Sequence, residues 1–271
     1  MQTSHFVQNG ETIMAFTEAG EGPALLLVHG FTGSKLDFQN QLPWFADLRR
    51  VIAYDQRGHG ETSNQRPYTL PAMVDDLVGL LDVLDIQRCD LLGHSLGGMV
   101  ALRAVLAHPD RFRSLILMDT APAPLGLWTR RARRALTKLV KREGCEALLE
   151  QSRQATPSPA QQRGIDYLGS EEHWRRISVK LQQMDPVAFV ELMTELSDHD
   201  SVAGRLGEIR CPATVIVGEH DAPFLAPSAV LAEGIDGARL MTIEGADHAP
   251  QYENADVWRQ AVREHLQRTE V

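Results

Sequence analysis

The stretch Asp90-Leu-Leu-Gly-His-Ser-Leu-Gly-Gly98 decides how this chain folds. It opens with a short apolar run typical of a buried strand, and it leads into Leu96–Ala107, an apolar segment typical of a helix. Between them, Gly93-His-Ser-Leu-Gly97 matches G-x-S-x-G, a sharp turn that needs glycine because a Cβ there would collide with the neighbouring chain. The pattern predicts that Ser95 projects its hydroxyl at the helix N-terminus, where the dipole favours a developing negative charge.

Similar apolar runs recur at Ala24–Val28, Val51–Tyr54, Ser114–Met118, Ala213–Val217 and Leu240–Ile243. Between them lie segments with apolar residues at helical spacing, such as Leu70–Leu84 and Asp256–Leu266. Near the start, Asn9-Gly10 separates two β-prone runs and predicts a hairpin. Strands that alternate with helices predict an α/β fold whose sheet is mostly parallel.

The alternation breaks between residues 123 and 206, where we find no clear strand. Two helical patterns, Trp128–Val140 and His173–Met184, lie in this stretch. A third helix is expected to begin at Asp185-Pro186, an N-cap followed by proline at the first helical position. We therefore predict a core made of residues 1–122 and 207–271, with residues 123–206 inserted as a helical lid.

The composition is that of an ordinary soluble globular protein, since 43% of the 271 residues are hydrophobic and 23% are charged. A net charge of −9 gives the chain no reason to bind nucleic acid or an anionic membrane. The N-terminal residues lack the regions of a signal peptide, and no apolar run approaches the roughly 20 residues that cross a bilayer. We expect a cytoplasmic monomer or homodimer that acts on a small molecule.

The three cysteines, Cys89, Cys145 and Cys211, are sparse and form no C-x-x-C pair. An odd count in this arrangement argues against a disulfide framework and against a structural zinc site. We expect no metal and no cofactor.

A reactive serine needs a general base, and that base needs an orienting carboxylate. His248 is the expected base, because it follows the run Leu240–Ile243 and so lies on a loop at the carboxyl edge of the sheet. His29 and His59 precede the serine and lie in glycine turns. His265 lies in the last helical segment, where we expect it to face solvent.

The expected acid is Asp221, which comes just after the run Ala213–Val217. Glu219 is close to it, and Asp119 follows the run Ser114–Met118, so both remain alternatives. Asp247, beside the expected base, is interpreted as a residue that shapes the loop.

Acyl transfer also needs two donors for the oxyanion that forms. The backbone N–H of Leu96, directly after the serine, is the first expected donor. The second is the N–H of Phe31, in the loop His29-Gly-Phe-Thr-Gly33 that follows another predicted strand.

With these motifs in order, the chain resembles the α/β-hydrolase superfamily. The segments that carry the resemblance are His29-Gly-Phe31, Asp55-Gln-Arg-Gly-His-Gly60, Gly93-His-Ser-Leu-Gly-Gly98, Gly218-Glu-His-Asp221 and Asp247-His248. The resemblance implies an eight-stranded, mostly parallel sheet flanked by helices, a Ser-His-Asp triad and no cofactor. Asp55 is expected to order its loop. Thr62 stands where the family often has serine.

Several activities remain open within this superfamily. A Ser95 acyl-enzyme implies cleavage of a carboxylic ester or a lactone. The stretch Val28–Ser34 also looks like the menaquinone-pathway synthase that eliminates pyruvate, and similar segments occur in enol-lactonases, carboxylesterases and carbon–carbon bond hydrolases. A ligand receptor on the same fold is a further alternative. The nucleophile position holds no aspartate, which argues against epoxide hydrolase and haloalkane dehalogenase chemistry.

The lid is expected to set the substrate. Its apolar residues predicted to contact substrate are Leu125, Trp128, Phe189 and Met193. One predicted lid helix is rich in cations, with Arg130, Arg131, Arg133, Arg134, Lys138, Lys141 and Arg142. These form either a solvated helix face or a site where one arginine faces inward and recognises an anionic substrate.

Overall fold

Eight strands form one sheet in the order β1-β2-β4-β3-β5-β6-β7-β8 in the computed structural model, which describes residues 3–269. β1 and β2 form the predicted hairpin around Asn9-Gly10, and β2 pairs antiparallel with β4. The other neighbouring strands pair in parallel, as expected. The strands are His5–Asn9 (β1), Thr12–Ala19 (β2), Ala24–Val28 (β3), Arg50–Tyr54 (β4), Cys89–His94 (β5), Phe112–Met118 (β6), Ala213–Gly218 (β7) and Arg239–Ile243 (β8).

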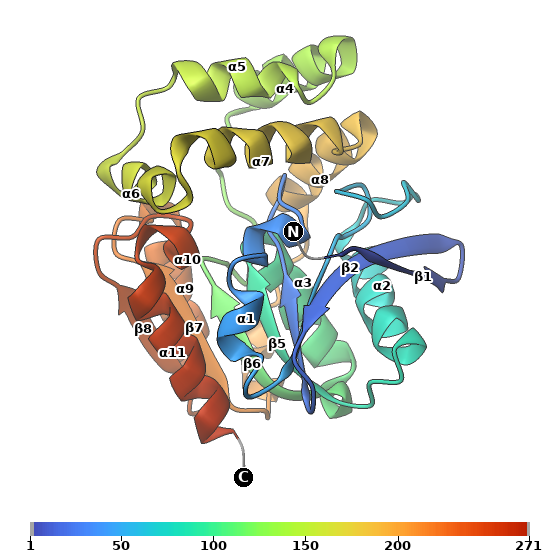
Figure 1. Cartoon of the computed structure of the whole chain (residues 1–271), viewed down its shortest axis with the longest axis vertical. Helices are drawn as coiled ribbons and strands as arrows, with labels where there is room; N and C mark the ends of the chain where they lie inside the picture. The colour runs from blue at the N-terminus through green and yellow to red at the C-terminus, as the bar shows by residue number, and fades with distance from the viewer. Residues whose placement is uncertain (1–2, 270–271) are drawn as a thin grey trace.

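Both faces of the central strands are buried, which explains why these strands are mostly apolar. In β3, Leu26 and Val28 pack into one core, whereas Leu25 and Leu27 pack into the other. The first core is covered by α2 (Leu70–Val83), α3 (Leu96–Ala107) and α9 (Ala222–Gly234), and the second by α1 (Leu42–Phe45) and α11 (Ala255–Arg268). The short helix α10 (Pro250–Glu253) precedes α11, and the two layers enclose the sheet in Figure 1.

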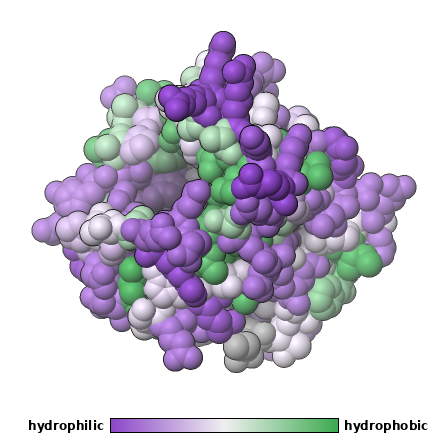
Figure 2. Space-filling view, turned by 90° about the horizontal axis from the view of Figure 1, so that it is seen from above, coloured by the Kyte–Doolittle hydropathy of each residue, from purple (hydrophilic) through white to green (hydrophobic). Residues whose placement is uncertain are grey.

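The predicted insertion leaves the sheet after β6 and returns to it at β7. Its five helices lie together above the carboxyl ends of the strands, at the top of Figure 1. Seen from above, this end of the molecule is mainly hydrophilic, with smaller apolar areas between the polar side chains (Figure 2). The helices are α4 (Arg130–Glu143), α5 (Ala147–Gln154), α6 (Pro159–Leu168), α7 (Ser170–Gln182) and α8 (Pro186–Asp198).

Local signals explain where the lid helices begin. Thr129, Ser158 and Asp185 each accept a backbone N–H at the start of α4, α6 and α8. The sequence analysis missed α5 and α6 because their apolar positions are few. No helix among residues 3–269 is long and apolar enough to cross a membrane.

The expectation that His265 faces solvent is wrong. Its side chain is buried, and the ring Nδ1 lies 2.8 Å from the Thr214 hydroxyl of β7. Burial lowers the pKa of His265 to about 3, so the ring is neutral. His265 follows the buried Trp258, Ala261 and Val262 at helical spacing, so it belongs to the stripe of α11 that faces the sheet.

Candidate active site

Ser95 lies in the predicted turn between β5 and α3. Its φ is +53° and its ψ is −117°, a conformation that non-glycine residues rarely adopt. The turn is tight, because a Cβ on Gly93 would lie 2.4 Å from the Gly97 carbonyl oxygen. A Cβ on Gly97 would in turn lie 2.3 Å from the carbonyl oxygen of Val28 in β3. The two glycines therefore let the chain bring a strained serine to the sheet edge.

The two expected amide donors lie beside this serine. Leu96 is the first residue of α3, where a helical N–H has no partner within its own helix. Gly30, which precedes Phe31, approaches from β3, since a Cβ on it would lie 3.1 Å from the Ser95 Cβ. A hydrogen bond of 3.0 Å from the Gly33 N–H to the Gly30 carbonyl closes this loop. The fold thus brings the loop of Phe31 and the N-terminus of α3 to the same serine.

The expected base and acid meet in space. The Nδ1 of His248 lies 2.7 Å from Oδ2 of Asp221, and the Asp221 side chain is almost fully buried. The Phe224 ring stacks on His248 at 4.7 Å between centroids. A carboxylate on Nδ1 selects the tautomer whose Nε2 is free to accept a proton. Among residues 3–269, the Ser95 hydroxyl makes no hydrogen bond to His248. Catalytic hydrogen bonds of this kind often tighten only when the substrate binds.

The rival carboxylates have other partners. Glu219 accepts the Gly245 N–H at 2.7 Å, and Asp247 accepts the hydroxyl of Ser158 in the lid at 3.3 Å. Asp119 is buried behind Asp221, and its Oδ1 accepts the N–H of Gly218 at 2.9 Å. Burial and the charge of Asp221 raise the pKa of Asp119 well above its usual value. Among these carboxylates, Asp221 is therefore the one that hydrogen-bonds to His248.

His94 has a contact that the sequence analysis missed. Its Nε2 lies 2.8 Å from the carbonyl oxygen of His248, so an N–H there holds the backbone of the base. Burial lowers the pKa of His94 to about 3, which keeps the ring neutral. The variable position of G-x-S-x-G, directly before Ser95, was the signal that could have found it.

Asp55 has the structural role expected from the resemblance, and Thr62, where the sequence departs from the family pattern, bonds to it. Asp55 accepts the backbone N–H groups of Lys35 and Glu61, so it orders the loop around it. Thr62 donates its hydroxyl to the Asp55 carbonyl at 2.6 Å and accepts the Ala15 N–H at 2.9 Å. Because a serine hydroxyl could make the same two bonds, the departure from the family pattern at Thr62 preserves them.

Ser95 and His248 line one cavity of about 260 Å³. Residues of α6 and α7 form its lid side, and the sequence analysis assigned none of them to the substrate site. The prediction that four apolar lid residues contact substrate is not supported, because none lines this cavity. Trp128 and Phe189 instead pack on Phe31, with ring centroids at 6.1 and 5.0 Å. The lid residues that line the cavity are Gln161, Gly164, Leu168, His173, Arg176, Ile177 and Lys180.

Leu125 and Met193 complete the correction. Leu125 packs, half-buried, against the apolar core that also includes Met193. Met193 is buried and lines a different groove on the lid. Met193 was expected over the substrate because its helix is amphipathic, a pattern that does not say which helix covers which part of the core; Leu125 lies in the segment before α4.

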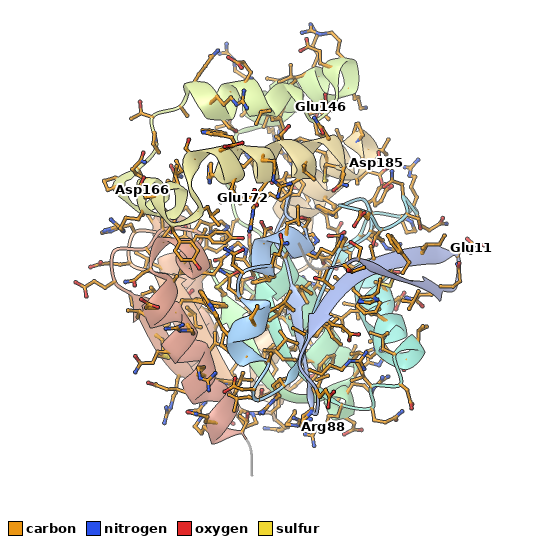
Figure 3. All side chains as sticks on the ribbon, viewed as in Figure 1. Glu11, Arg88, Glu146, Asp166, Glu172 and Asp185 are labelled. Carbon is orange, nitrogen blue, oxygen red and sulfur yellow. The ribbon has the colours of Figure 1, made fainter. Side chains whose placement is uncertain are left out.

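Two cations of α7 attach the lid to the core beside the cavity. Lys180 Nζ lies 2.6 Å from Oδ1 of Asp37. Arg176 donates to the Leu36 carbonyl at 3.1 Å, to Asn40 at 2.8 Å and to Glu172 at 2.7 Å. Glu172 is labelled in Figure 3, where it points from α7 toward the core. The bonds to Asp37, Leu36 and Asn40 fix the height of α7 above the Ser95 turn.

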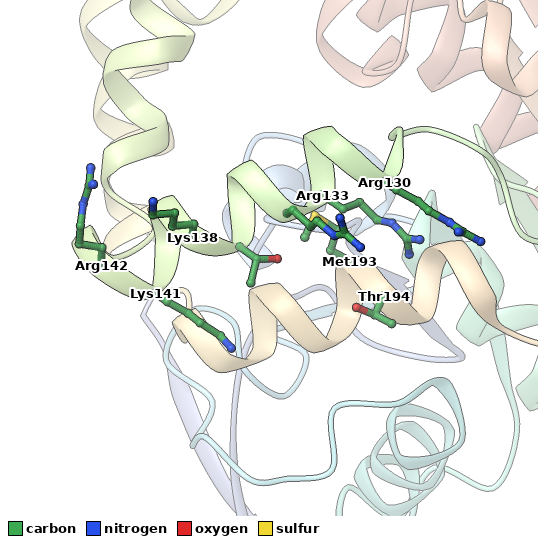
Figure 4. A pocket seen from close by; sticks show the side chains of 9 residues that line it. Arg130, Arg133, Lys138, Lys141, Arg142, Met193 and Thr194 are labelled. Carbon is green, nitrogen blue, oxygen red and sulfur yellow. The ribbon is translucent and has the colours of Figure 1, made fainter.

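The cations of α4 lie elsewhere. Arg130, Arg134 and Lys138 line an open groove of about 770 Å³ between α4 and α8, bounded by Met193 and Thr194 (Figure 4). Ser95 does not line this groove. The structure thus contradicts the hypothesis that an arginine of this helix faces the substrate, and the cations beside Ser95 come from α7.

Asp119, Asp221 and His248 also lie close enough to one another to hold a cation. One oxygen each of Asp119 and Asp221 and one nitrogen of His248 lie within 4.8 Å of one another. The His248–Asp221 contact at 2.7 Å already uses two of these atoms in a hydrogen bond. We therefore keep the expectation that the site works without a metal.

Comparisons with known proteins agree with this architecture. A model of the α/β hydrolase fold family matches residues 23–255. A Bacillus subtilis (strain 168) protein with the provisional name 2-succinyl-6-hydroxy-2,4-cyclohexadiene-1-carboxylate synthase is 29% identical over 264 residues, 93% of this chain and 94% of that protein. The 3-oxoadipate enol-lactonase 2 of Acinetobacter baylyi is 28% identical over 91% of this chain and 89% of its own.

Among solved structures, a thermophilic esterase from Thermogutta terrifontis is 27% identical, with a TM-score of 0.84 over 99% of this chain and 100% of its own. The sheet, the inserted lid and the family match lead to one conclusion. This chain belongs to the α/β hydrolase fold family.

Proposed function

We propose that this protein is a serine hydrolase that cleaves a carboxylic ester or lactone through an acyl-enzyme on Ser95. The observation that carries the proposal is the 2.7 Å contact of Asp221 with His248, in the same cavity as a serine held at φ +53°. A paired carboxylate and imidazole next to a serine on a strained turn are the parts that serine-based acyl transfer requires.

The proposed reaction proceeds in two steps. His248 Nε2 takes the proton of Ser95 as the serine oxygen attacks the carbonyl carbon, and the N–H groups of Leu96 and Phe31 receive the oxyanion. The intermediate collapses with loss of the alkoxide, which takes the proton from His248. Water, activated by the same ring, then attacks the acyl group and releases the acid and free Ser95. Asp221 keeps the imidazole oriented throughout.

The size and lining of the cavity favour a small substrate with polar groups. Its volume of about 260 Å³ is at the low end for ligand sites, and it leaves little room for a long acyl chain. Gln161, His173 and Lys180 contribute polar atoms on the lid side, whereas Leu168 and Ile177 contribute apolar ones. We therefore expect short-chain esters or small lactones to react faster than long-chain esters.

A second candidate is carbon–carbon bond cleavage or pyruvate elimination with the same three residues. It is favoured by the similarity to the Bacillus subtilis protein along most of both chains. The presence of Arg176 and Lys180 in the cavity also suits a substrate that carries a carboxylate.

A substrate panel tests both candidates. It contains p-nitrophenyl esters of two to twelve carbons (about the range a small cavity can distinguish), small lactones and a vinylogous diketone, each with wild type and Ser95→Ala. We expect turnover of the short esters or lactones and its loss in the variant. Turnover of the diketone alone would favour the second candidate. Activity that survives in Ser95→Ala would contradict the mechanism, and a wild type inert to a fluorophosphonate probe would favour a receptor.

A further inference from the structure

Asp119, the rival acid, is held rigidly at the end of β6. It is fully buried, and its φ of +45° lies in the left-handed region. Its N–H donates to the Ile216 carbonyl of β7 at 2.9 Å, and its Oδ1 accepts the N–H of Gly218 at 2.9 Å. These two bonds aim the carboxyl group toward the start of α9. Within residues 3–269, its buried Oδ2 receives no N–H or O–H donor.

The carboxyl group next to it is that of Asp221. One oxygen of each and a nitrogen of His248 lie within 4.8 Å of one another. One oxygen of Asp221 is hydrogen-bonded to His248. Asp221 is also the residue before α9, but its side chain caps no backbone N–H of that helix. Two ionised carboxylates this close in a buried place repel each other, whereas one shared proton removes the repulsion. That proton also supplies the hydrogen bond that Asp119 Oδ2 otherwise lacks.

We propose that Asp119 is a positioning residue, a neutral carboxylic acid whose O–H donates to the Asp221 carboxylate and holds it against His248. The inference rests on the proposed function, because it assigns Asp221 the role of orienting the base. Burial and the Asp221 charge keep the pKa of Asp119 high, and Glu253 of α10 raises it further, against the Gly218 N–H that lowers it. Asp119, at the end of β6, thus acts through Asp221, which follows β7.

Two substitutions of similar size separate this role from other roles. Asp119→Asn keeps the shape and presents an N–H to Asp221 and an oxygen to Gly218, as a neutral acid does. Asp119→Leu keeps the number and branching of the side-chain heavy atoms and offers neither. The first readout is the rate at which a fluorophosphonate labels Ser95 between about pH 5 and 9, a range that spans histidine titration. The second is the low-field proton resonance of His248 Nδ1–H, which needs no substrate.

We expect the rate of Ser95 labelling in Asp119→Asn to be within about threefold of the wild-type rate. In Asp119→Leu we expect labelling to be about 10- to 100-fold slower, which is the loss expected for a hydrogen bond to a charged group. Melting temperature and far-UV circular dichroism of the two variants are compared alongside. The resonance should persist in wild type and in Asp119→Asn, and it should shift or broaden in Asp119→Leu.

Four results would overturn the proposal. An equal loss of labelling rate in both variants would mean that Asp119 acts as an anion. An unchanged rate in both variants would mean that Asp119 does not position Asp221. Loss of labelling on chelation, restored by a divalent cation, would assign the cluster to a metal. If Asp119→Leu does not fold, a missing resonance in Asp119→Asn overturns the proposal. A wild type that is not labelled but keeps the resonance would refute the proposed function alone.

Discussion

The assignment of the acid can be tested by Asp221→Asn, which removes the charge beside His248 and leaves the shape almost unchanged. The Asp221 side chain is 4% exposed, so water replaces little of the lost interaction. The Asn amide also offers an N–H to Nδ1, which favours the tautomer that cannot accept the serine proton.

The size of the effect follows from two contributions. A hydrogen bond to a charged group contributes about 1.5–3 kcal/mol, which orients the ring at 2.7 Å from the carboxylate. A charge about 4 Å from the imidazolium that forms in the transition state stabilises it by about 4 kcal/mol at an effective dielectric constant near 20. These contributions overlap, so the total of about 4–5.5 kcal/mol corresponds to a loss of about 10³- to 10⁴-fold in kcat.

The assay compares kcat and KM for the best short ester with wild type, Asp221→Asn and Asp119→Asn. We expect kcat to fall in Asp221→Asn while KM changes little, because Asp221 does not line the cavity. Asp119→Asn is the matched control, since it changes a buried carboxyl a few ångströms away to the same amide. A large loss in Asp119→Asn together with a small loss in Asp221→Asn would refute the assignment of the acid.

Three further changes test the lid, the turn and the cavity. Lys180→Met should lower the free energy of unfolding by about 1–2 kcal/mol, because it leaves the nearly buried Asp37 unpaired. Burial raises the pKa of Asp37, but the charge and hydrogen bond of Lys180, together with smaller contributions from His29 and the Ser34 N–H, outweigh burial, so the pKa is lowered. The stabilisation is therefore present above the unfolded pKa of about 3.9 and is lost as pH falls through the folded pKa, so the melting curves of the two proteins should converge below about pH 3.9. Gly97→Ala should yield little soluble protein, since its Cβ would meet a β3 carbonyl at 2.3 Å, and soluble protein with normal Ser95 labelling would contradict the tight turn. Ile177→Trp should raise KM about tenfold or more by filling the cavity, whereas Arg134→Gln, in the separate groove, should leave it unchanged; equal KM values would disprove the assignment of the cavity.

The local features of this protein could be predicted because neighbouring residues decide them. The apolar runs became β3 to β8, and the turn at Ser95 formed where two glycines allow close contact. The meeting of His248 with Asp221 was also predictable, because loops after adjacent parallel strands meet at one edge of the sheet.

Only the tertiary structure decided which residues cover Ser95 and which residue lies behind Asp221. Trp128 and Lys180 both lie on amphipathic lid segments, and only packing put Lys180 in the cavity and Trp128 on Phe31. His265 was misjudged because a polar residue in an apolar stripe reveals its partner only when the sheet is in place. Asp119 and Asp221 are about a hundred residues apart in the chain, and their carboxyl groups lie within 4.8 Å of each other because β6 and β7 pair. Periodicity encodes which face of a helix is buried, whereas the partner of that face depends on contacts between segments distant in sequence.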